Sequence, residues 1–452
     1  MWRIAPVALS ALGCAALFEP LARHHFGPPA RWGAALFGLG TGTILFTGRV
    51  PFGLGVAIGL GALLALQRGR PALAAGLAAA CGLTSPIAGL FLALAAVAYA
   101  LASWRERRGE GLVLAAAAVL PPLAVTFAFP EGGNHPFAFK SLAAIPVFCA
   151  LLLLLLPARE RALRVGAGLY LILALAAFAV DNPVGKNAVR LGELFAAPLL
   201  LCALAASPLS RVRAAAGAVV LFGLFWWQWR EPVIQVGRAE GDPSGEPAYF
   251  KPLLDFLERA GGGRWRVEVP FTRQHWEAAE VAPRFPLARG WHRQVDTERN
   301  ALFYDGTLDA STYRDWLAEY GVRFVALPDA PLDKSAHEER ELILAGQPYL
   351  APRGSVGPWR IWEVTAPRPM TVPDRPADIS LAELGTDSFT LAVRRPGDAL
   401  VRVHWTPYWR VEGGCVERDG DWTRVTARRA GSLRVSTTFA PARIFDRGRR
   451  CD

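Results

Sequence analysis

Hydrophobic and polar positions follow two different patterns on either side of Trp229-Arg230. Before this point, long uncharged apolar runs alternate with short charged loops, and the runs approach the roughly 20 residues that a helix needs to cross a bilayer. Ten segments fit this description: 4–21, 32–46, 51–66, 71–84, 86–104, 111–129, 139–156, 163–180, 191–206 and 214–229. We therefore predict that residues 1–230 form a multispan α-helical membrane bundle of about ten spans.

The loops between the apolar segments carry the orientation signal. If the chain crosses at every segment, 12 Lys and Arg residues fall on one side and 5 on the other, and the richer side is cytoplasmic by the positive-inside rule. Residues 71–104 contain no charge and can also form one long helix kinked at Ser85-Pro86. Because Arg68 and Arg105 flank this stretch and both fall on the basic side, two crossings are expected. This topology predicts a multi-pass plasma-membrane protein with Met1 and the C-terminal half outside.

The second half alternates at helix and strand spacing. Residues 231–245 have the composition of a linker, and residues 246–366 predict an extracytoplasmic α/β domain in which helices at 249–259, 311–320 and 336–345 alternate with short strands. A proline-rich connector follows. Residues 375–452 then predict a small all-β, sandwich-like domain, because five or more short alternating runs are separated by turn signals.

Charge and cysteine placement agree with this division. Residues 1–230 contain 18 Lys and Arg against 7 Asp and Glu, whereas the remaining residues contain 31 against 32. The basic excess therefore belongs to the membrane half, which argues against nucleic acid as a partner. Cys415 and Cys451 lie in the exported half, where oxidising conditions permit a disulfide between them. No Cys/His cluster has metal-ligand spacing, and no cofactor is expected.

The most polar stretch of the membrane half begins at Asp181 and continues to Glu193. If residues from Asn187 onward are helical, Asn187 and Arg190 share one face with the next-turn position, Glu193 or Leu194. The planar guanidinium of Arg190 suits a phosphate or diphosphate. The alternative is an Arg190–Glu193 pair that only fixes the depth of the helix in the membrane.

Three further groups bear on the same outer face. Glu131 and Asp181 are candidate acid/base residues, although a solvated turn is the plainer interpretation of the segment around Glu131. Arg49 is the only charge in its short turn and would add a cation to the mouth. In the exported half, Trp276, Arg289, Trp291 and Gln294 interleave aromatic and planar polar groups, which suits a carbohydrate, a lipid head group or an ordinary domain contact.

Two glycine-rich tracts, 38–42 and 53–61, lie within apolar segments. Neither joins a strand to a helix, as a phosphate-binding loop requires. Small residues at such spacing allow membrane helices to approach closely. We expect them to serve helix packing.

Scattered motifs over most of the chain resemble actinobacterial-type integral membrane proteins of the GT-C glycosyltransferase-like class. These motifs are Thr47-Gly-Arg-Val-Pro-Phe-Gly-Leu-Gly, Gln67-Arg-Gly-Arg-Pro, Thr84-Ser-Pro-Ile-Ala-Gly-Leu, Gly185…Asn187…Arg190-Leu, Trp276-Glu-Ala, Pro286-Leu-Ala-Arg-Gly-Trp, Tyr313…Trp316-Leu and Val322-Arg-Phe-Val-Ala-Leu-Pro-Asp. The resemblance implies a membrane bundle whose outer face accepts a polyprenyl-phosphate-linked sugar. It also implies an exported domain that helps bind the acceptor, and transfer by an inverting mechanism.

One departure from the class concerns the catalytic base. Such enzymes place an acidic residue in the first outer loop, whereas the only acid before Glu106 is Glu19, which the topology puts at the cytoplasmic end of the first span. Either a helix and loop precede this sequence, or the protein has no transferase activity. The alternative function is a non-catalytic scaffold or a transporter with an extracytoplasmic binding domain.

Overall fold

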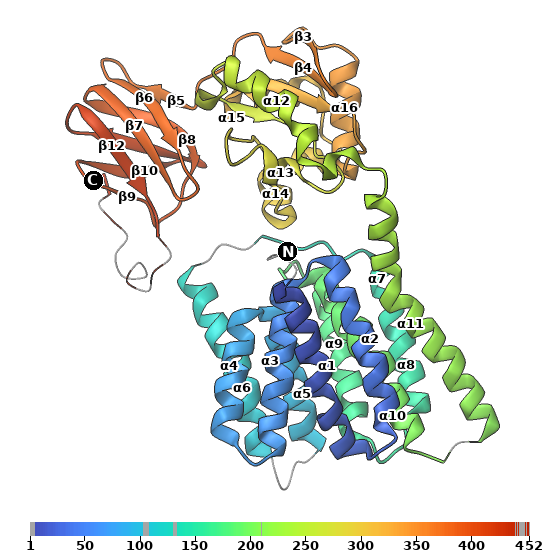
Figure 1. Cartoon of the computed structure of the whole chain (residues 1–452). Coiled ribbons are helices and arrows are strands. Elements are labelled where there is room, and N and C mark those ends of the chain that lie inside the picture. Colours follow the sequence, from blue (N-terminus) through green and yellow to red (C-terminus); the bar gives the residue numbers. More distant parts are fainter. Residues whose placement is uncertain are drawn as a thin grey trace. The chain divides into compact units, whose positions relative to one another are not determined.

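The structure is a computed structural model that describes residues 5–102, 108–129, 133–208, 210–438, 440, 442, 448, 450 and 451. The chain divides into two compact units, Met1–Glu240 and Gly241–Asp452. Figure 1 shows that the first unit is helical and that the second combines an α/β part with β-sheets. Each unit is described by itself.

The first unit is a bundle of mostly apolar helices (Figure 1). They are α1 (Ala5–Phe26), α2 (Ala30–Thr47), α3 (Val50–Gln67), α4 (Pro71–Thr84), α5 (Pro86–Ala102), α6 (Arg108–Ala128), α7 (Phe139–Leu142), α8 (Ala144–Leu155), α9 (Arg161–Ala179), α10 (Val189–Ala205) and α11 (Arg211–Ala239), with a 3-10 turn η1 (Gly185–Ala188) before α10. Helix α2 packs against α1 and α10, and α3 packs against α1 and α4.

Every one of the ten apolar segments contains a helix, but not all are long enough to span a membrane. Among the described residues, five helical stretches are long and apolar enough to cross: α1, α3, α6, α9 and Gly185–Ala205. The stretches Pro71–Thr84, Pro86–Ala102 and Phe139–Leu155 are shorter apolar helices. The structure therefore supports a membrane protein with five candidate spans rather than confirming ten.

The uncharged stretch 71–104 is divided into two helices. Ser85 has an extended backbone (φ −152°, ψ 106°) that ends α4, and Pro86 begins α5. The Ser85 hydroxyl accepts a hydrogen bond from the Ala88 backbone N–H at 3.3 Å, which caps the new helix. The break at Ser85-Pro86 is confirmed, with two helices in place of one kinked helix.

The expected linker at 231–245 is wrong for its first nine residues. Helix α11 continues without interruption from Arg211 to Ala239, and the unit boundary lies at Glu240. A hydrogen bond from Gln235 to Glu231 at 2.8 Å joins neighbouring turns of this extension. The polar composition of residues 231–239 suggested a linker, but these residues continue the helix beyond its aromatic segment.

The glycine tracts serve close helix packing. A side chain at Gly55 would meet the Ala88 and Ser85 Cβ atoms at 2.8 and 2.9 Å, so α3 and α5 approach at this point only because Gly55 has none. Gly53 lies similarly close to Ile44. These contacts fit the packing interpretation of the tract 53–61.

The second unit begins with an α/β part built on one mixed sheet of order β1-β2-β4-β3. Its strands are β1 (Arg266–Glu268), β2 (Val322–Pro328), β3 (Leu350–Val356) and β4 (Trp359–Val364); its main helices are α12 (Pro247–Arg259), α13 (Glu277–Glu280), α14 (Arg293–Arg299), α15 (Ala310–Tyr320) and α16 (His337–Leu344). Strands β1 and β2 are parallel and the other pairs antiparallel. Asp309 caps α15, and Gly321 ends it with a left-handed φ of 68°. Strand β3 and the short helices α13 and α14 were not predicted.

The all-β part consists of two four-stranded antiparallel sheets, of order β10-β11-β8-β5 and β6-β7-β12-β9. Their strands are β5 (Thr371–Pro373), β6 (Asp378–Leu384), β7 (Ser388–Arg395), β8 (Gly397–His404), β9 (Arg410–Val411), β10 (Gly414–Asp419), β11 (Trp422–Ala427) and β12 (Gly431–Ser436). Residues from both sheets share one hydrophobic core, which is the arrangement of a β-sandwich. The Cys415–Cys451 disulfide is present, with Cα atoms 5.0 Å apart.

Candidate functional site

A short turn between α2 and α3 presents a cation at one end of the membrane bundle. Gly48 ends α2 in a left-handed conformation (φ 63°), Arg49 follows as the N-cap of α3, and Pro51 begins the new helix. Glycine permits the turn because it has no Cβ, and proline suits a helix start because its missing N–H would have no partner there. The Arg49 side chain therefore lies at the rim of the bundle.

Helix α10 brings a second cation and a carboxylate to the same place. A small pocket is lined by Thr43, Ile44, Thr47, Arg49, Phe52, Arg190, Glu193 and Leu194. Arg49 forms an ion pair with Glu193 at 3.6 Å, and the Arg190 guanidinium lies 5.3 Å from the centre of the Phe52 ring. We call Arg49, Phe52, Arg190 and Glu193 the Arg190 mouth.

The N–H donors of the Arg190 guanidinium have no acceptor among the described residues. Within the described part of the chain its guanidinium makes no ion pair or hydrogen bond, and it lies over the Phe52 ring. Glu193 interacts electrostatically with Arg49, Lys186 and Glu231 as well as with Arg190. The structure thus pairs Glu193 with Arg49 in place of the Arg190–Glu193 pair that was considered, and it leaves Arg190 available to an anion.

An apolar cavity of about 630 Å³ lies within the bundle next to this mouth. Its lining follows α3 from Gly55 to Gln67, twelve residue steps or roughly 18 Å along a helix. The Gly55 end lies one turn from Phe52, and Leu191 and Gly192 of the lining directly follow Arg190. A long apolar space therefore begins beside the Arg190 mouth and extends along the bundle.

The opposite end of the cavity is polar. Glu160 is buried there and contacts His25 Nε2 at 2.8 Å and Arg159 Nε at 3.3 Å. Arg159 also donates to the Ala206 carbonyl at 2.9 Å, which ties the α8–α9 turn to the end of α10. At this end of the cavity, the Glu160 carboxylate is therefore in contact with His25 and Arg159.

The other predicted residues of the membrane half lie outside the pocket lining. Asp181 is exposed and accepts a 2.7 Å hydrogen bond from Asn134, which joins the two polar loops that were predicted separately. Asn187 lies in η1, one turn before Arg190, and is not among the lining residues. Glu131 lies outside the described residues.

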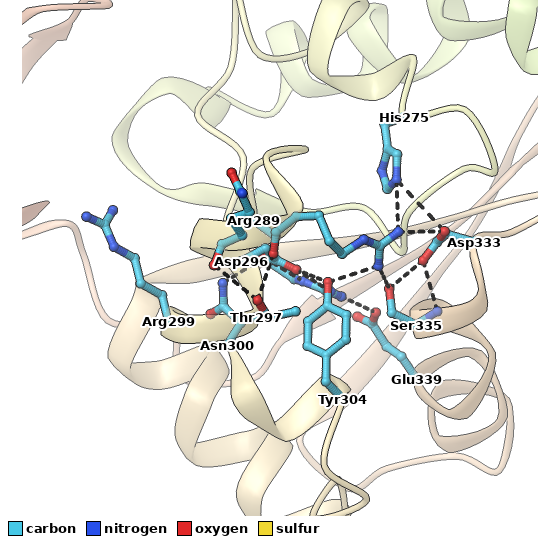
Figure 2. A network of polar contacts seen from close by, with 12 residues as sticks. His275, Arg289, Asp296, Thr297, Arg299, Asn300, Tyr304, Asp333, Ser335 and Glu339 are labelled. Carbon is cyan, nitrogen blue, oxygen red and sulfur yellow. Dashed lines mark hydrogen bonds and ion pairs between the residues drawn. The ribbon is translucent and has the colours of Figure 1, made fainter. Parts of the chain in front are cut away.

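In the second unit, Arg289 is the centre of a buried network (Figure 2). It pairs with Asp296 at 2.8 Å and with Glu339 at 3.4 Å, and its guanidinium lies between the Phe271 and Phe303 rings. Arg289 is only 2% exposed, so its donors face the interior of the domain and not a ligand. Trp276 and Trp291, predicted alongside it, are 39% and 62% exposed.

A second buried carboxyl group, Glu268, lies beside Arg289 together with Glu339. Both side chains are fully buried, and the single Arg289 guanidinium also pairs with Asp296, so charge on both Glu268 and Glu339 is disfavoured. Burial, together with the negative charge of Glu339, raises the pKa of Glu268 well above its usual value. Burial also raises the pKa of Glu339, to about 7, despite the nearby charge of Arg289 and the hydroxyl of Tyr313, which donates at 2.8 Å.

His275, Arg293 and Asp333 are partly exposed. Figure 2 shows His275 and Asp333 at the edge of the same network. Arg293 pairs with Asp333 at 2.8 Å and lies 3.4 Å from His275 Nε2. Burial raises the pKa of Asp333, but hydrogen bonds from Arg293 and from Ser335 outweigh it, so the pKa is lowered and the group stays ionised. We call these three residues the His275 cluster.

Sequence reasoning missed several of these residues for identifiable reasons. Phe52 resembles any apolar residue of a span, and Glu193 was considered only as a partner for Arg190. Glu268 and Glu339 come from a strand and a helix that are 71 positions apart, so nothing local in the sequence indicates that they meet. His275 directly precedes the predicted Trp276, and this position was the only feature of the sequence that pointed to it.

Comparisons with known proteins give one structural likeness. No family model and no curated protein matches the chain. A solved structure of the arabinofuranosyltransferase AftD from mycobacteria is similar, with a TM-score of 0.42 and 15% sequence identity. The match covers 96% of this chain and 53% of that enzyme, so the chain spans about half of its length.

Proposed function

We propose that this membrane protein binds a lipid-linked sugar phosphate and transfers the sugar at the Arg190 mouth, as the GT-C-like motifs suggest. The observation that carries the proposal is the Arg190 guanidinium, which has no hydrogen-bond or ion-pair partner among the described residues and lies close to an apolar cavity of about 630 Å³. A polyprenyl phosphate has the same division, with an anionic group at one end of a long apolar chain. Arg190 would bind the phosphate through its planar fork, and the cavity would receive part of the chain.

The carboxylate best placed for the chemistry is Glu193. In the proposed step, an acceptor hydroxyl oxygen attacks the anomeric carbon, and the bond from that carbon to the phosphate oxygen breaks. The electron pair stays on the lipid phosphate, where Arg190 stabilises the charge, and the hydroxyl proton passes to Glu193. Arg49, 3.6 Å away, would hold the Glu193 carboxylate in position before the step. Glu193 replaces Asp181 and Glu131 as our candidate base, because it lines the same pocket as Arg190.

The test separates binding from chemistry. In full-length protein in nanodiscs, Arg190→Ala should weaken binding of a polyprenyl phosphate by about 10- to 100-fold, the value of one or two charge-assisted hydrogen bonds. Arg190→Lys should recover only part of it, because an ammonium lacks the planar fork. Arg68→Ala is the matched control, since Arg68 is exposed at the opposite end of α3.

Glu193→Gln addresses the transfer step. It should lower kcat for transfer from a polyprenyl-phosphate sugar while leaving lipid-phosphate affinity within about twofold of wild type. If Arg190→Ala binds the lipid phosphate as tightly as Arg68→Ala does, the proposal is wrong.

A non-catalytic scaffold is the second candidate, and the Arg49–Glu193 ion pair favours it. A pair of this kind at the end of a helix can simply fix its depth in the membrane. In that case neither wild-type protein nor Glu193→Gln would transfer a sugar, and Glu193→Gln would only lower the thermal stability.

A further inference from the structure

The His275 cluster is held in an unusual backbone conformation. His275 has φ +58°, the left-handed region that side chains other than glycine rarely adopt. Its turn is held by a 3.1 Å hydrogen bond from the His275 N–H to the Thr272 carbonyl and by a 3.3 Å bond from the Trp276 N–H to the Thr272 hydroxyl. Such conformations persist where the surroundings enforce them, and they gather at ligand sites.

The imidazole is oriented so that one nitrogen can accept. The Arg293 guanidinium lies 3.4 Å from Nε2 and can only donate, so this contact requires Nε2 to accept. Nδ1 lies 3.4 Å from the buried Glu277 carboxylate, and the Thr272 hydroxyl donates to the other Glu277 oxygen at 2.5 Å. The ring therefore lies between Arg293 and a carboxylate that Thr272 holds in place.

Two exposed indoles flank the cluster in the sequence. Trp276 directly follows His275, and Trp291 lies two positions before Arg293. Both expose large apolar faces in a soluble unit, where only Leu344 among the other described large hydrophobic residues is comparably exposed. The contact between His275 and Arg293 brings the two segments together.

The polar and aromatic side chains at the His275 cluster indicate which class of ligand could bind there. Arg293 offers donors, Asp333 offers acceptors, and the Trp rings offer flat apolar surfaces. The Arg293 guanidinium is already paired with Asp333, so it has no uncompensated charge to attract an anionic head group. Sugar hydroxyls donate and accept, and the C–H face of a sugar ring is apolar. We propose that the His275 cluster, with Trp276 and Trp291, binds a neutral carbohydrate.

The experiment uses full-length protein in nanodiscs and short neutral oligosaccharides, one series of pentoses and one of hexoses, with a sulfated oligosaccharide as the anionic comparison. Saturation-transfer NMR or biolayer interferometry measures affinity. Trp291→Ala and Asp333→Asn should each weaken binding of the neutral ligand by about tenfold, through loss of an aromatic surface and of a charged acceptor. Trp291 is 62% exposed, so its removal should leave folding intact.

Matched controls come from the same α/β part. Leu344→Ala removes another exposed apolar side chain, and Asp315→Asn breaks the exposed Arg314–Asp315 pair. Both should bind within about twofold of wild type. The Arg190→Ala variant should also retain carbohydrate binding, so failure of the lipid-phosphate proposal and failure of this one are distinguishable.

Three results would overturn the proposal. The first is absence of binding to every neutral oligosaccharide by wild-type protein. The second is equal affinity of Asp333→Asn and Asp315→Asn. The third is quenching of the Trp291 fluorescence by brominated lipids in the nanodisc, which would make the exposed indoles a membrane contact.

Discussion

The buried carboxyl pair Glu268–Glu339 predicts that the second unit loses stability as the pH rises. Both side chains are fully buried, on β1 and α16, and the charged and titratable groups that face them are Arg289, Asp296 and Tyr313. One guanidinium cannot neutralise three carboxylates, so the pair keeps a proton when folded. Replacing Glu268 by Gln removes one of the two carboxyl groups and with it the need for that proton.

The size of the effect follows from the raised pKa. Burial raises the pKa of Glu339 from 4.5 to about 7. A group whose pKa is raised by folding contributes its full stability below the unfolded value and loses it as the pH rises through the folded value. At 1.36 kcal/mol per pH unit, the interval from 4.5 to 7 corresponds to a loss of about 3 kcal/mol from the free energy of unfolding. Glu268→Gln removes the other raised carboxyl of the pair, so between pH 5 and pH 8 it should lose less stability than wild type, by an amount on the order of the same 3 kcal/mol.

Thermal unfolding followed by tryptophan fluorescence measures this difference. Trp359 and Trp316 are buried in the same α/β part and report on its unfolding. For a unit of this size, about 3 kcal/mol corresponds to a Tm difference of about 6 to 12 °C. Glu338→Gln is the matched control, since Glu338 is the exposed neighbour of Glu339 on α16.

The comparison between variants isolates the pair from all other titrating groups. If the Tm difference between Glu268→Gln and wild type is the same at pH 5 and pH 8, the two carboxyls do not share a proton and the reasoning fails. A Glu338→Gln variant with the same pH dependence as Glu268→Gln would also refute it, because the effect would then be a general one of surface charge.

Two further predictions concern packing and covalent linkage. Gly82→Ala should destabilise the bundle by about 1–3 kcal/mol, because a Cβ at Gly82 would collide with the Ala118 carbonyl of α6. Gly76→Ala on the same helix meets open space and should be neutral or stabilising. Thermal unfolding in detergent compares the two variants. Replacing both Cys415 and Cys451 by Ala should lower the stability of the β-sandwich by about 3–4 kcal/mol, because the disulfide closes a loop between cysteines 36 residues apart. Equal Tm values for the oxidised protein and this variant would contradict the prediction.

Local patterns determined much of the architecture. The ten apolar segments each contain a helix because an uncharged run has no other way to satisfy its backbone in a membrane. The boundary at Ser85-Pro86, the cap and stop of α15 at Asp309 and Gly321, and most strands of the sandwich follow from residues a few positions apart. The Cys415–Cys451 pairing followed because only these two cysteines lie after the apolar half of the chain.

Composition misled where a helix is stabilised by its neighbours. Residues 231–239 look like a linker, yet they extend α11 because an established helix propagates at little cost once its first turns exist. The number of spans is not confirmed, since apolar composition alone does not separate a 14-residue helix such as α4 from a membrane-crossing one.

The sites depend on contacts that no local pattern contains. Arg49 and Arg190 were predicted separately, but only the packing of α2 against α10 places both, with Glu193, around one pocket beside an apolar cavity. Arg289 looked like a ligand-binding arginine and is instead enclosed by Phe271, Phe303 and two carboxylates. The sequence by itself determined the apolar helices and most of the strands, because these depend on short-range periodicity. Only the tertiary structure decided which charges are paired and which remain free to bind, because pairing depends on distances between residues far apart in the chain.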